Sequence, residues 1–363
     1  MTPAIVFDDN HPHLSPLTDL RASFDVRTGV LTTLERLTLA LDLEIATLSV
    51  PATAAALTQE RHPRTRVNAT EGLSGPVLLI NGRCPLSYEP IAELQVGQSV
   101  VEDKSGDLVA ALVSAEAASA FLSGRPLDAV GIAALPFPAL LSRPWHVRTF
   151  RDDCIKSDLE LLDDGEPADI PAGVIAFGQH SLTISPSAKI YPGVILDLEH
   201  GPIAIGPDTV VRPGVTLIGP CAMLPHSTAL DKALIKGNSV IGPHCKVAGE
   251  VGGVIFQGFA NKAHDGHLGD SYVGEWVNLG AGTTNSNLLN TYAQVTSRAE
   301  PDGRTEHTGQ QFLGAMIGDH CKFAISSRLM TGCVLHTGVM WAATAPVIGC
   351  VPRFAWSTDA GLR

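Results

Sequence analysis

Residues 264–287 read HDGHLGDSYVGEWVNLGAGTTNSN and combine histidines, asparagines and a glycine-rich turn. A histidine exchanges protons near neutral pH, so His264 is a candidate general base. The small residues 280–282 let backbone N–H groups approach a ligand, where they can stabilise a developing oxyanion. Acyl transfer from a thioester to an amine requires both of these groups. Asn278 and Asn287 are candidates to hydrogen-bond the hydroxyl groups or the amide of the acceptor.

The same residues also have a structural interpretation. A histidine at a turn is often a solvated surface group, and an asparagine there often hydrogen-bonds the neighbouring backbone. His267, His320 and His336 are expected to be structural. Both interpretations depend on the elements that hold this segment.

A six-residue repeat surrounds the segment. Apolar residues recur at every sixth position, and this step is kept at Ile205, Val211, Leu217, Met223, Ala229, Ile235, Ile241 and Val247. The step returns at 273 and 279, and again from 317 to 347. A period of six fits a β-solenoid in which each short strand places one apolar side chain inward. With coils of roughly eighteen residues, the repeat region is predicted to form about eight or nine coils within a β-helix domain over residues 179–363.

The first half has a different pattern. Apolar runs at 3–9, 44–50, 76–82 and 107–114 are typical of strands, and 30–43 and 115–124 are typical of helices. Their alternation predicts an α/β domain over residues 1–149. The acidic helical segment that begins at 150 and the Pro/Gly break after it are assigned to a linker, 150–178.

Composition limits the possible partners. The 363 residues carry a formal net charge of −12, which argues against nucleic acid and against an anionic membrane surface. No apolar run reaches membrane-spanning length and no signal peptide is recognisable, so a cytoplasmic protein is expected. The seven cysteines are scattered without a CxxC pair, which favours reduced, buried thiols.

Hexads such as IGPDTV, IGPHCK and VGEWVN resemble the hexapeptide-repeat acyltransferases, whose fold is a left-handed parallel β-helix. Residues 264–287 are similar to the acetyltransferase segment of the bifunctional glucosamine-1-phosphate acetyltransferase and N-acetylglucosamine-1-phosphate uridyltransferase family. The resemblance implies acetyl-CoA as co-substrate, an amino-sugar phosphate or nucleotide sugar as acceptor, and a homotrimer. It places the catalytic residue at His264 and the cofactor contacts at Ala281 and Ala343. Substrate contacts fall on Arg212, Lys262, Asn278 and Asn287.

The chain departs from that family at several positions. His267 stands where the family has a tyrosine, and 288–316 is an insertion. In NGRCPL (81–86), Arg83 replaces an aspartate that binds Mg²⁺ in the nucleotidyltransferase domain of the family, and a cation cannot ligate a metal ion. A glycine-rich phosphate loop is also missing after the first predicted strand. Magnesium-dependent nucleotidyl transfer is therefore expected to be weak or absent.

Other opening residues, FDD…LSPLTDLR…VRTGVLT, resemble a group of sugar nucleotidyltransferases, which makes Asp8, Asp9, Arg21 and Arg27 candidates to bind a sugar nucleotide. Three alternatives to acetyl transfer thus stay open. The first domain can transfer nucleotides to a sugar 1-phosphate. The solenoid can be a γ-type carbonic anhydrase with zinc on histidines such as His264 and His267. The protein can also be a non-catalytic, trimeric sugar-nucleotide-binding protein.

Overall fold

The computed structural model describes residues 3–127 and 131–363 and divides into two compact units. The first unit comprises the described parts of Met1–Leu14, Leu20–Val26 and Leu31–Ser142. The second comprises Ser15–Asp19, Arg27–Val30 and Arg143–Arg363. Two short segments of the N-terminal half thus belong to the same compact unit as the C-terminal half.

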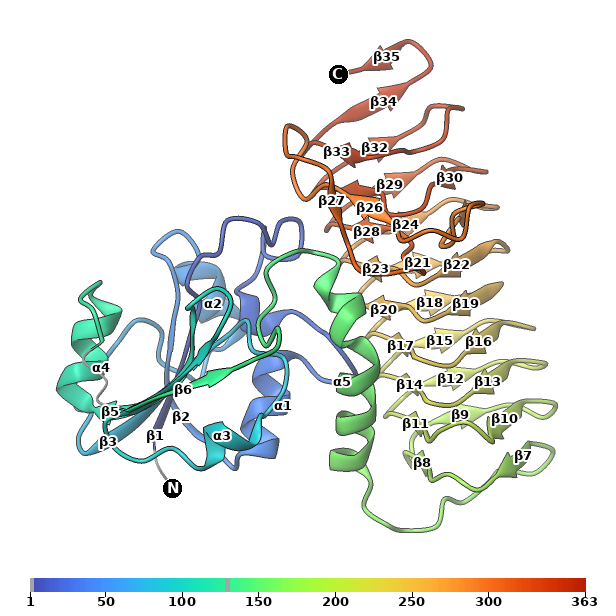
Figure 1. Cartoon of the computed structure of the whole chain (residues 1–363). Coiled ribbons are helices and arrows are strands. Elements are labelled where there is room, and N and C mark those ends of the chain that lie inside the picture. Colours follow the sequence, from blue (N-terminus) through green and yellow to red (C-terminus); the bar gives the residue numbers. More distant parts are fainter. Residues whose placement is uncertain (1–2, 128–130) are drawn as a thin grey trace. The chain divides into compact units, whose positions relative to one another are not determined.

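The first unit is an α/β domain built on a mixed sheet (Figure 1). Over its described residues the sheet has six strands in the order β2 (Glu44–Ser49), β1 (Pro3–Phe7), β3 (Pro76–Asn81), β5 (Leu108–Ser114), β4 (Gln98–Glu102) and β6 (Gly131–Leu135). β5 is antiparallel to both neighbours, and the remaining pairs are parallel. The helices around it are α1 (Thr33–Ala40), α2 (Ala55–Arg61), α3 (Glu89–Ala92) and α4 (Ala115–Leu122), with a 3-10 turn at Ser23–Asp25.

Local sequence accounts for most of these elements. The four predicted strands are present as β1, β2, β3 and β5, and the two predicted helices as α1 and α4. α1 begins at a capping box, because Thr32 accepts from the Glu35 N–H while the Glu35 carboxylate accepts from the Thr32 N–H. Alternate residues of β3 pack into separate apolar cores on the two faces of the sheet. The elements α2, α3, β4 and β6 were not predicted.

Helix α5 (His146–Leu162) connects the two halves in sequence and belongs to the second unit. Most of it, together with strand β7 (Ile175–Gly178), lies in the segment 150–178 that was assigned to a linker. Arg148 and Arg151 both bind the Asp270 carboxylate at 2.9 Å, and Arg151 also donates to the Gly253 carbonyl. These contacts fix the helix along the solenoid, and the exact domain limits stay a prediction.

The second unit is the left-handed parallel β-helix, whose short strands form three long sheets (Figure 1). The first sheet contains β7, β10 (Ile195–Leu198), β13 (Thr216–Ile218), β16 (Leu234–Lys236), β19 (Glu250–Gly252) and β22 (His267–Gly269). The second contains β8 (Leu182–Ile184), β11 (Ile203–Ile205), β14 (Cys221–Met223), β17 (Ser239–Ile241), β20 (Ile255–Phe256), β23 (Tyr272–Val273), β28 (Met316–Ile317), β31 (Val334–Leu335) and β33 (Cys350–Val351). Within 131–363, its nine strands agree with the predicted eight or nine coils.

The third sheet contains β9 (Lys189–Ile190), β12 (Val210–Val211), β15 (Thr228–Ala229), β18 (Lys246–Val247), β21 (Asn261–Lys262), β24 (Asn278–Leu279), β29 (Lys322–Phe323), β32 (Met340–Trp341), β34 (Trp356–Thr358) and β35 (Gly361–Leu362). A parallel pair, β25 (Thr284–Asn285) and β30 (Arg328–Leu329), follows the coils of the first sheet. The apolar residues at the six-residue step point inward and form one continuous core. The period predicted the solenoid because each strand supplies one such residue.

The outer face of the second sheet is also buried. Ala222, Val240, Ile255 and Met316 point away from the core, and each is at most 1% exposed. Part of this face is covered by α5, because Leu159 and Leu162 line a hollow with Thr183 and Ala204. The six-residue step therefore misses a second set of apolar positions.

Aromatic and imidazole rings stack along one corner of the solenoid, between the second and third sheets. His226, His244, Phe259, Trp276 and His320 all have positive φ, and successive ring centroids lie 4.7 to 6.4 Å apart. His320 belongs to this stack, as expected for a structural residue. His336 is fully buried, and its Nε2 lies 2.9 Å from the Ala299 carbonyl oxygen.

The insertion 288–316 folds back on the coils. It contains the antiparallel pair β26 (Thr296–Ser297) and β27 (Glu306–His307). The Ser297 hydroxyl donates to the Gly332 carbonyl, and Val295 and Ala299 are buried. The insertion is thus an ordered part of the second unit.

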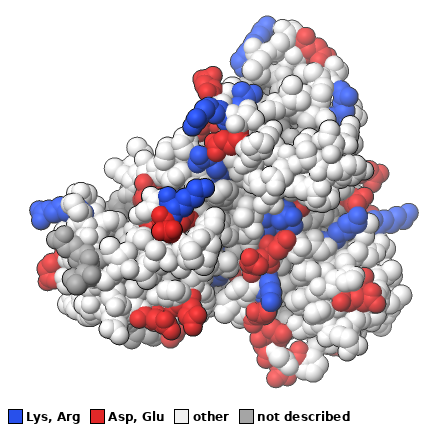
Figure 2. All heavy atoms as spheres, in the orientation of Figure 1, with Lys and Arg blue, Asp and Glu red and all other residues white. Residues whose placement is uncertain are grey.

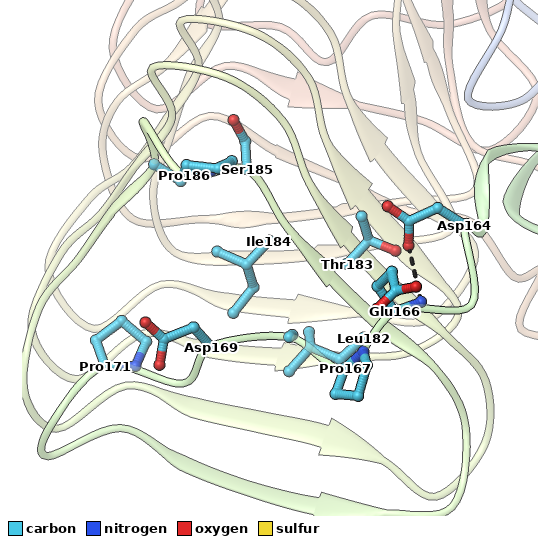
Figure 3. Close-up of a pocket in the computed structure, with 12 residues that line it drawn as sticks. Asp164, Glu166, Pro167, Asp169, Pro171, Leu182, Thr183, Ile184, Ser185 and Pro186 are labelled. Atoms are coloured by element: carbon cyan, nitrogen blue, oxygen red, sulfur yellow. Dashed lines mark hydrogen bonds between the residues drawn. The ribbon is translucent and has the colours of Figure 1, made fainter.

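The open end of the first coil holds a hollow of about 430 Å³. Figure 3 shows Ile184 near its centre, with Asp164, Glu166 and Leu182 on one side and Asp169 and Pro171 on the other. This hollow is where the solenoid core ends, and none of the predicted site residues lines it.

The cysteines, the surface charges and the hydropathy of the helices can be compared with the composition of the sequence. The seven cysteines are free thiols, six of them buried, and burial raises the pKa of Cys221 and Cys333 to about 12. Positive and negative side chains are intermixed on the face shown in Figure 2. None of the helices in the described residues is both long and apolar enough to cross a membrane.

Candidate active site

Two consecutive turns bring the predicted catalytic groups to one corner. We use "His264 corner" for the turns that lead from the third sheet to the first, including 263–266 and 280–283. They follow β21 and β24, which pair in parallel, so His264 and Ala281 lie on adjacent coils about 4.8 Å apart along the axis. His264 is exposed, and among the described residues its ring has no hydrogen-bond partner. Neither Asp265 nor a carbonyl orients the ring.

The turn at 280–283 leaves a backbone donor available. The Gly280 N–H donates to the Phe323 carbonyl, and the Ala281 carbonyl accepts from Ser326 at 2.7 Å. The Ala281 N–H has no protein partner in the part of the chain that the structure describes. A Cβ at Gly280 would lie 2.6 Å from the Ala324 backbone, so the turn requires glycine there. The corner therefore offers the donor that an oxyanion needs.

Lys262 lies inside the solenoid. It pairs with Val247 in the third sheet, takes an inward position and is 2% exposed. Its Nζ donates to the Ala248 carbonyl at 3.1 Å and to the His264 carbonyl at 2.9 Å. Burial lowers the pKa of this amine to about 8. Its ammonium group fixes the turn that carries His264 and is not directed to solvent, where a phosphate would bind.

Asn278 lies on the exposed outer face of the third sheet, two residues before Gly280. Its neighbours across the sheet are Asn261 and Lys322. The side chain of Lys322 donates to the Trp276 carbonyl, and burial lowers the pKa of that lysine. Asn278 is thus an exposed amide close to the His264 corner.

Asn287 lies at the other end of the first sheet from His264, beyond β22. Its Nδ2 donates to the Asp270 carboxylate at 2.8 Å. A Cβ placed on Gly269 would lie 2.7 Å from both the Asn287 Nδ2 and the His267 Nε2. The His267 and Asn287 side chains therefore converge over Gly269 on the outer face of β22.

Arg212 and Ala343 lie on the same corner at other levels. Arg212 follows β12, three coils before the His264 turn and thus about 14 Å away along the axis. It pairs with Asp231 at 3.2 Å and packs over the Tyr191 ring at 4.6 Å. Ala343 follows β32, two coils after Ala281. The structure brings His264 and Ala281 together, but it does not bring Arg212 to them within one subunit.

The first unit holds a cluster of ion pairs around the buried Arg83, whose carboxylate partners Asp9 and Asp107 are partly exposed. The Arg83 side chain is 1% exposed and binds Asp9 through Nε at 2.9 Å and Asp107 through Nη2 at 2.8 Å. Asn81 donates to Asp9 at 3.0 Å. Burial alone would raise the pKa of Asp9, but the hydrogen bonds and charge of Arg83 outweigh it and lower that pKa. The neighbouring Asp8 has its pKa raised, mainly by burial.

The donor set of this cluster does not fit a divalent cation. Mg²⁺ needs free carboxylate oxygens, and Arg83 already binds both oxygens of Asp9 and Oδ2 of Asp107, so a second cation there would be repelled by the guanidinium group. No group of three or more His, Cys, Asp or Glu side chains in the described residues is placed to hold a metal ion. That observation also leaves the zinc hypothesis without a ligand set within one chain. Arg21 and Arg27 are both buried.

The sequence is similar to a protein family and to several curated proteins. Residues 4–166 match the sugar nucleotidyl transferase family. The bifunctional protein GlmU of Cyanothece sp. is 25% identical over 201 residues, which cover 50% of this chain and 40% of that protein. The GlmU of Gloeobacter violaceus is 30% identical over 129 residues, 35% of this chain and 24% of that protein. The chain thus spans about two fifths or less of the length of these relatives.

A solved structure also matches. The UDP-N-acetylglucosamine acyltransferase of Francisella novicida is 15% identical and covers 50% of this chain and 67% of its own, with a TM-score of 0.29. The family match to 4–166 runs from β1 through α5, so it includes residues of both compact units.

The sequence did not predict the roles of Glu250, Gly269 and Asp107, because these roles depend on pairing between distant coils or strands.

Proposed function

We propose that the solenoid transfers an acetyl group from acetyl-CoA to the amine of an amino-sugar phosphate or nucleotide sugar at the His264 corner. The observation that carries this proposal is the placement of His264 and the available Ala281 N–H on adjacent turns. The similarity to GlmU proteins supports the same class of reaction. Ala343, two coils beyond Ala281, supports a cofactor groove that runs along the corner.

The reaction follows from these positions. The amine nitrogen attacks the thioester carbonyl, a C–N bond forms, and the Ala281 N–H stabilises the oxyanion of the tetrahedral intermediate. His264 takes the proton that the nitrogen releases. The C–S bond then breaks, and the thiolate of CoA leaves and receives a proton. Lys262 acts as a positioning residue, because its ammonium group holds the His264 carbonyl.

Substrate contacts complete the proposal. Asn278 and Asn287 are proposed to hydrogen-bond the acceptor, and Arg212 is proposed to bind its phosphate through a bidentate pair. Within one subunit Arg212 is three coils from His264, and a homotrimer with the groove between neighbouring subunits is part of the proposal. Sedimentation at micromolar concentration tests it, and a monomer contradicts the trimer.

Thiol release tests the activity. Acetyl-CoA and longer acyl-CoA donors are incubated with a panel of amino sugars, their phosphates and nucleotide sugars, and free CoA is measured. Release that depends on both an amino acceptor and the enzyme supports the proposal. Binding of acetyl-CoA without release across the panel contradicts it and favours a non-catalytic binding protein.

The family match over residues 4–166 favours nucleotidyl transfer as a second candidate function for the first half. The cluster around the buried Arg83 opposes the magnesium-dependent form of that reaction. We expect no robust pyrophosphate release from UTP and a sugar 1-phosphate, and Arg83→Asp does not restore it. Strong release by the wild type contradicts this expectation.

A further inference from the structure

A second histidine near the His264 corner is held in a defined orientation. His267 is the first residue of β22 and pairs with Glu250 of β19 one coil below. Its Nδ1 lies 3.4 Å from the Glu250 carboxylate, and its Nε2 lies over Gly269 beside the Asn287 amide. The side chain of His267 is 34% exposed, so a ligand can reach it. His264 has no such orienting partner.

Glu250 is itself fixed and ionised. Lys236 donates to it at 2.7 Å, and this hydrogen bond is the main reason that the pKa of Glu250 is lowered. A carboxylate that faces one imidazole nitrogen places the N–H on that nitrogen and leaves the other as a proton acceptor. The lone pair of the His267 Nε2 is therefore available beside the Asn287 amide on the open face of β22.

The chemistry of the acceptor creates a need for such a group. Aliphatic amines are mostly protonated at neutral pH, with pKa values of about 8 to 10. An ammonium group has no lone pair and cannot attack a thioester. The conversion of R–NH₃⁺ and acetyl-S-CoA to R–NH–acetyl and HS-CoA releases two protons from nitrogen. One of these protonates the leaving thiolate, and the other passes to solvent.

We infer that His267, oriented by Glu250, takes the first of these protons from the ammonium group of the acceptor. The N–H bond breaks, the electron pair stays on nitrogen, and the proton moves to Nε2 and then to solvent. His264 takes the second proton during attack. This inference rests on the proposed acetyl transfer, and it assigns catalytic roles to two histidines that lie three residues apart.

The pH dependence of acetyl transfer tests the inference. For an acceptor amine with a pKa of about 8, His267→Ala should lower kcat/KM at pH 7 by about 10²-fold, and most of the loss should disappear near pH 9.5, where such an amine is already neutral. Glu250→Gln should show the same relief with a smaller loss. His264→Ala should remain impaired at both pH values, because the second proton is released only during attack. His200→Ala, which removes another exposed histidine, serves as the control.

Gly269→Ala provides a variant that keeps both histidines. Its Cβ displaces the His267 and Asn287 side chains, so its activity should follow the same pH pattern as that of His267→Ala. A loss in His267→Ala that is the same at every pH indicates a structural role and overturns the inference, as does unchanged activity. Absence of thiol release by the wild type instead refutes the proposed function, so the two failures are distinguishable.

Discussion

The Arg83 cluster and the His264 corner differ in whether their polar groups already have hydrogen-bond or ion-pair partners in the protein. In the first unit, the carboxylate groups of Asp9 and Asp107 bind the guanidinium group of Arg83, whose side chain is 1% exposed. At the His264 corner, the His264 ring and the Ala281 N–H have no protein partner among the described residues. Charges that are paired and buried stabilise a fold, whereas exposed groups without partners are available to a ligand.

This difference bears on the functions proposed for the two regions. A nucleotidyltransferase that uses Mg²⁺ must keep its carboxylates open until the metal ion binds. Here the protein supplies its own cation, and the guanidinium group of Arg83 would repel a metal ion at the same carboxylates. The corner of the solenoid keeps the exposed His264 ring and the Ala281 N–H, the proposed base and oxyanion donor, on a rigid repeat, which is the arrangement that the proposed catalysis requires. A substitution at Arg83 tests this comparison directly, and two further substitutions test how burial and partners set the pKa of Lys262 and of Asp19.

Arg83→Ala should have the largest effect on stability. It leaves two partly exposed carboxylates without their cation, and the loss of the charged hydrogen bonds of a buried guanidinium group costs about 3 kcal/mol. Hydrogen exchange of the β1 and β3 amides measures the loss in the first unit. Arg212→Ala is the matched control, because its pair with Asp231 is exposed, and it should change stability little. Equal effects of the two substitutions would contradict the comparison.

Lys262→Met should change the pH dependence of stability. The pKa of Lys262 falls from 10.5 to about 8 on folding, so the unfolded state binds more protons between these values. The unfolding free energy of the wild type should therefore rise with pH across this window, by roughly 3 kcal/mol from this group. Urea unfolding from pH 8 to 10.5 should show a flatter profile for the variant. Parallel profiles would show that Lys262 does not titrate inside the solenoid.

Asp19→Asn should have the smallest effect. Burial would raise the pKa of Asp19, but hydrogen bonds from Arg353 and Ser15 outweigh it and lower that pKa. Its stabilisation is present above the unfolded value of 3.8 and is lost as the pH falls through the folded pKa. The variant should lose about 1 kcal/mol at pH 7, and the difference should shrink in acid. A constant difference down to acid pH would exclude this linkage.

The six-residue step predicted the solenoid because the inward positions are almost all apolar. Lys262 shows where such a pattern fails. It occupies an inward position between Val247 and Leu279, but a lysine there does not look like a core residue, and its role depends on carbonyls of a neighbouring turn. The outer apolar positions of the second sheet were missed because they alternate with the inward ones and are buried by other segments.

The candidate site was predictable where its residues are close in sequence. His264, Asn278 and Ala281 lie within 18 residues. Because one coil separates His264 from Ala281, these two residues lie on the same corner. The orientation of His267 by Glu250 depends on the pairing of these two residues between β19 and β22 on successive coils. The pairing of Arg83 with Asp107 depends on the order of the strands in the sheet of the first unit, where β3 lies beside β5. Neither register can be read from a single sequence without the fold.

The most direct test of the central claim is the turnover of His264→Ala in acetyl transfer from acetyl-CoA. If His264 is the general base, kcat falls by about 10²–10⁴-fold, while the affinity for acetyl-CoA and the assembly state stay nearly unchanged. Near-normal turnover of His264→Ala across the pH range would contradict the assignment of this corner as the active site.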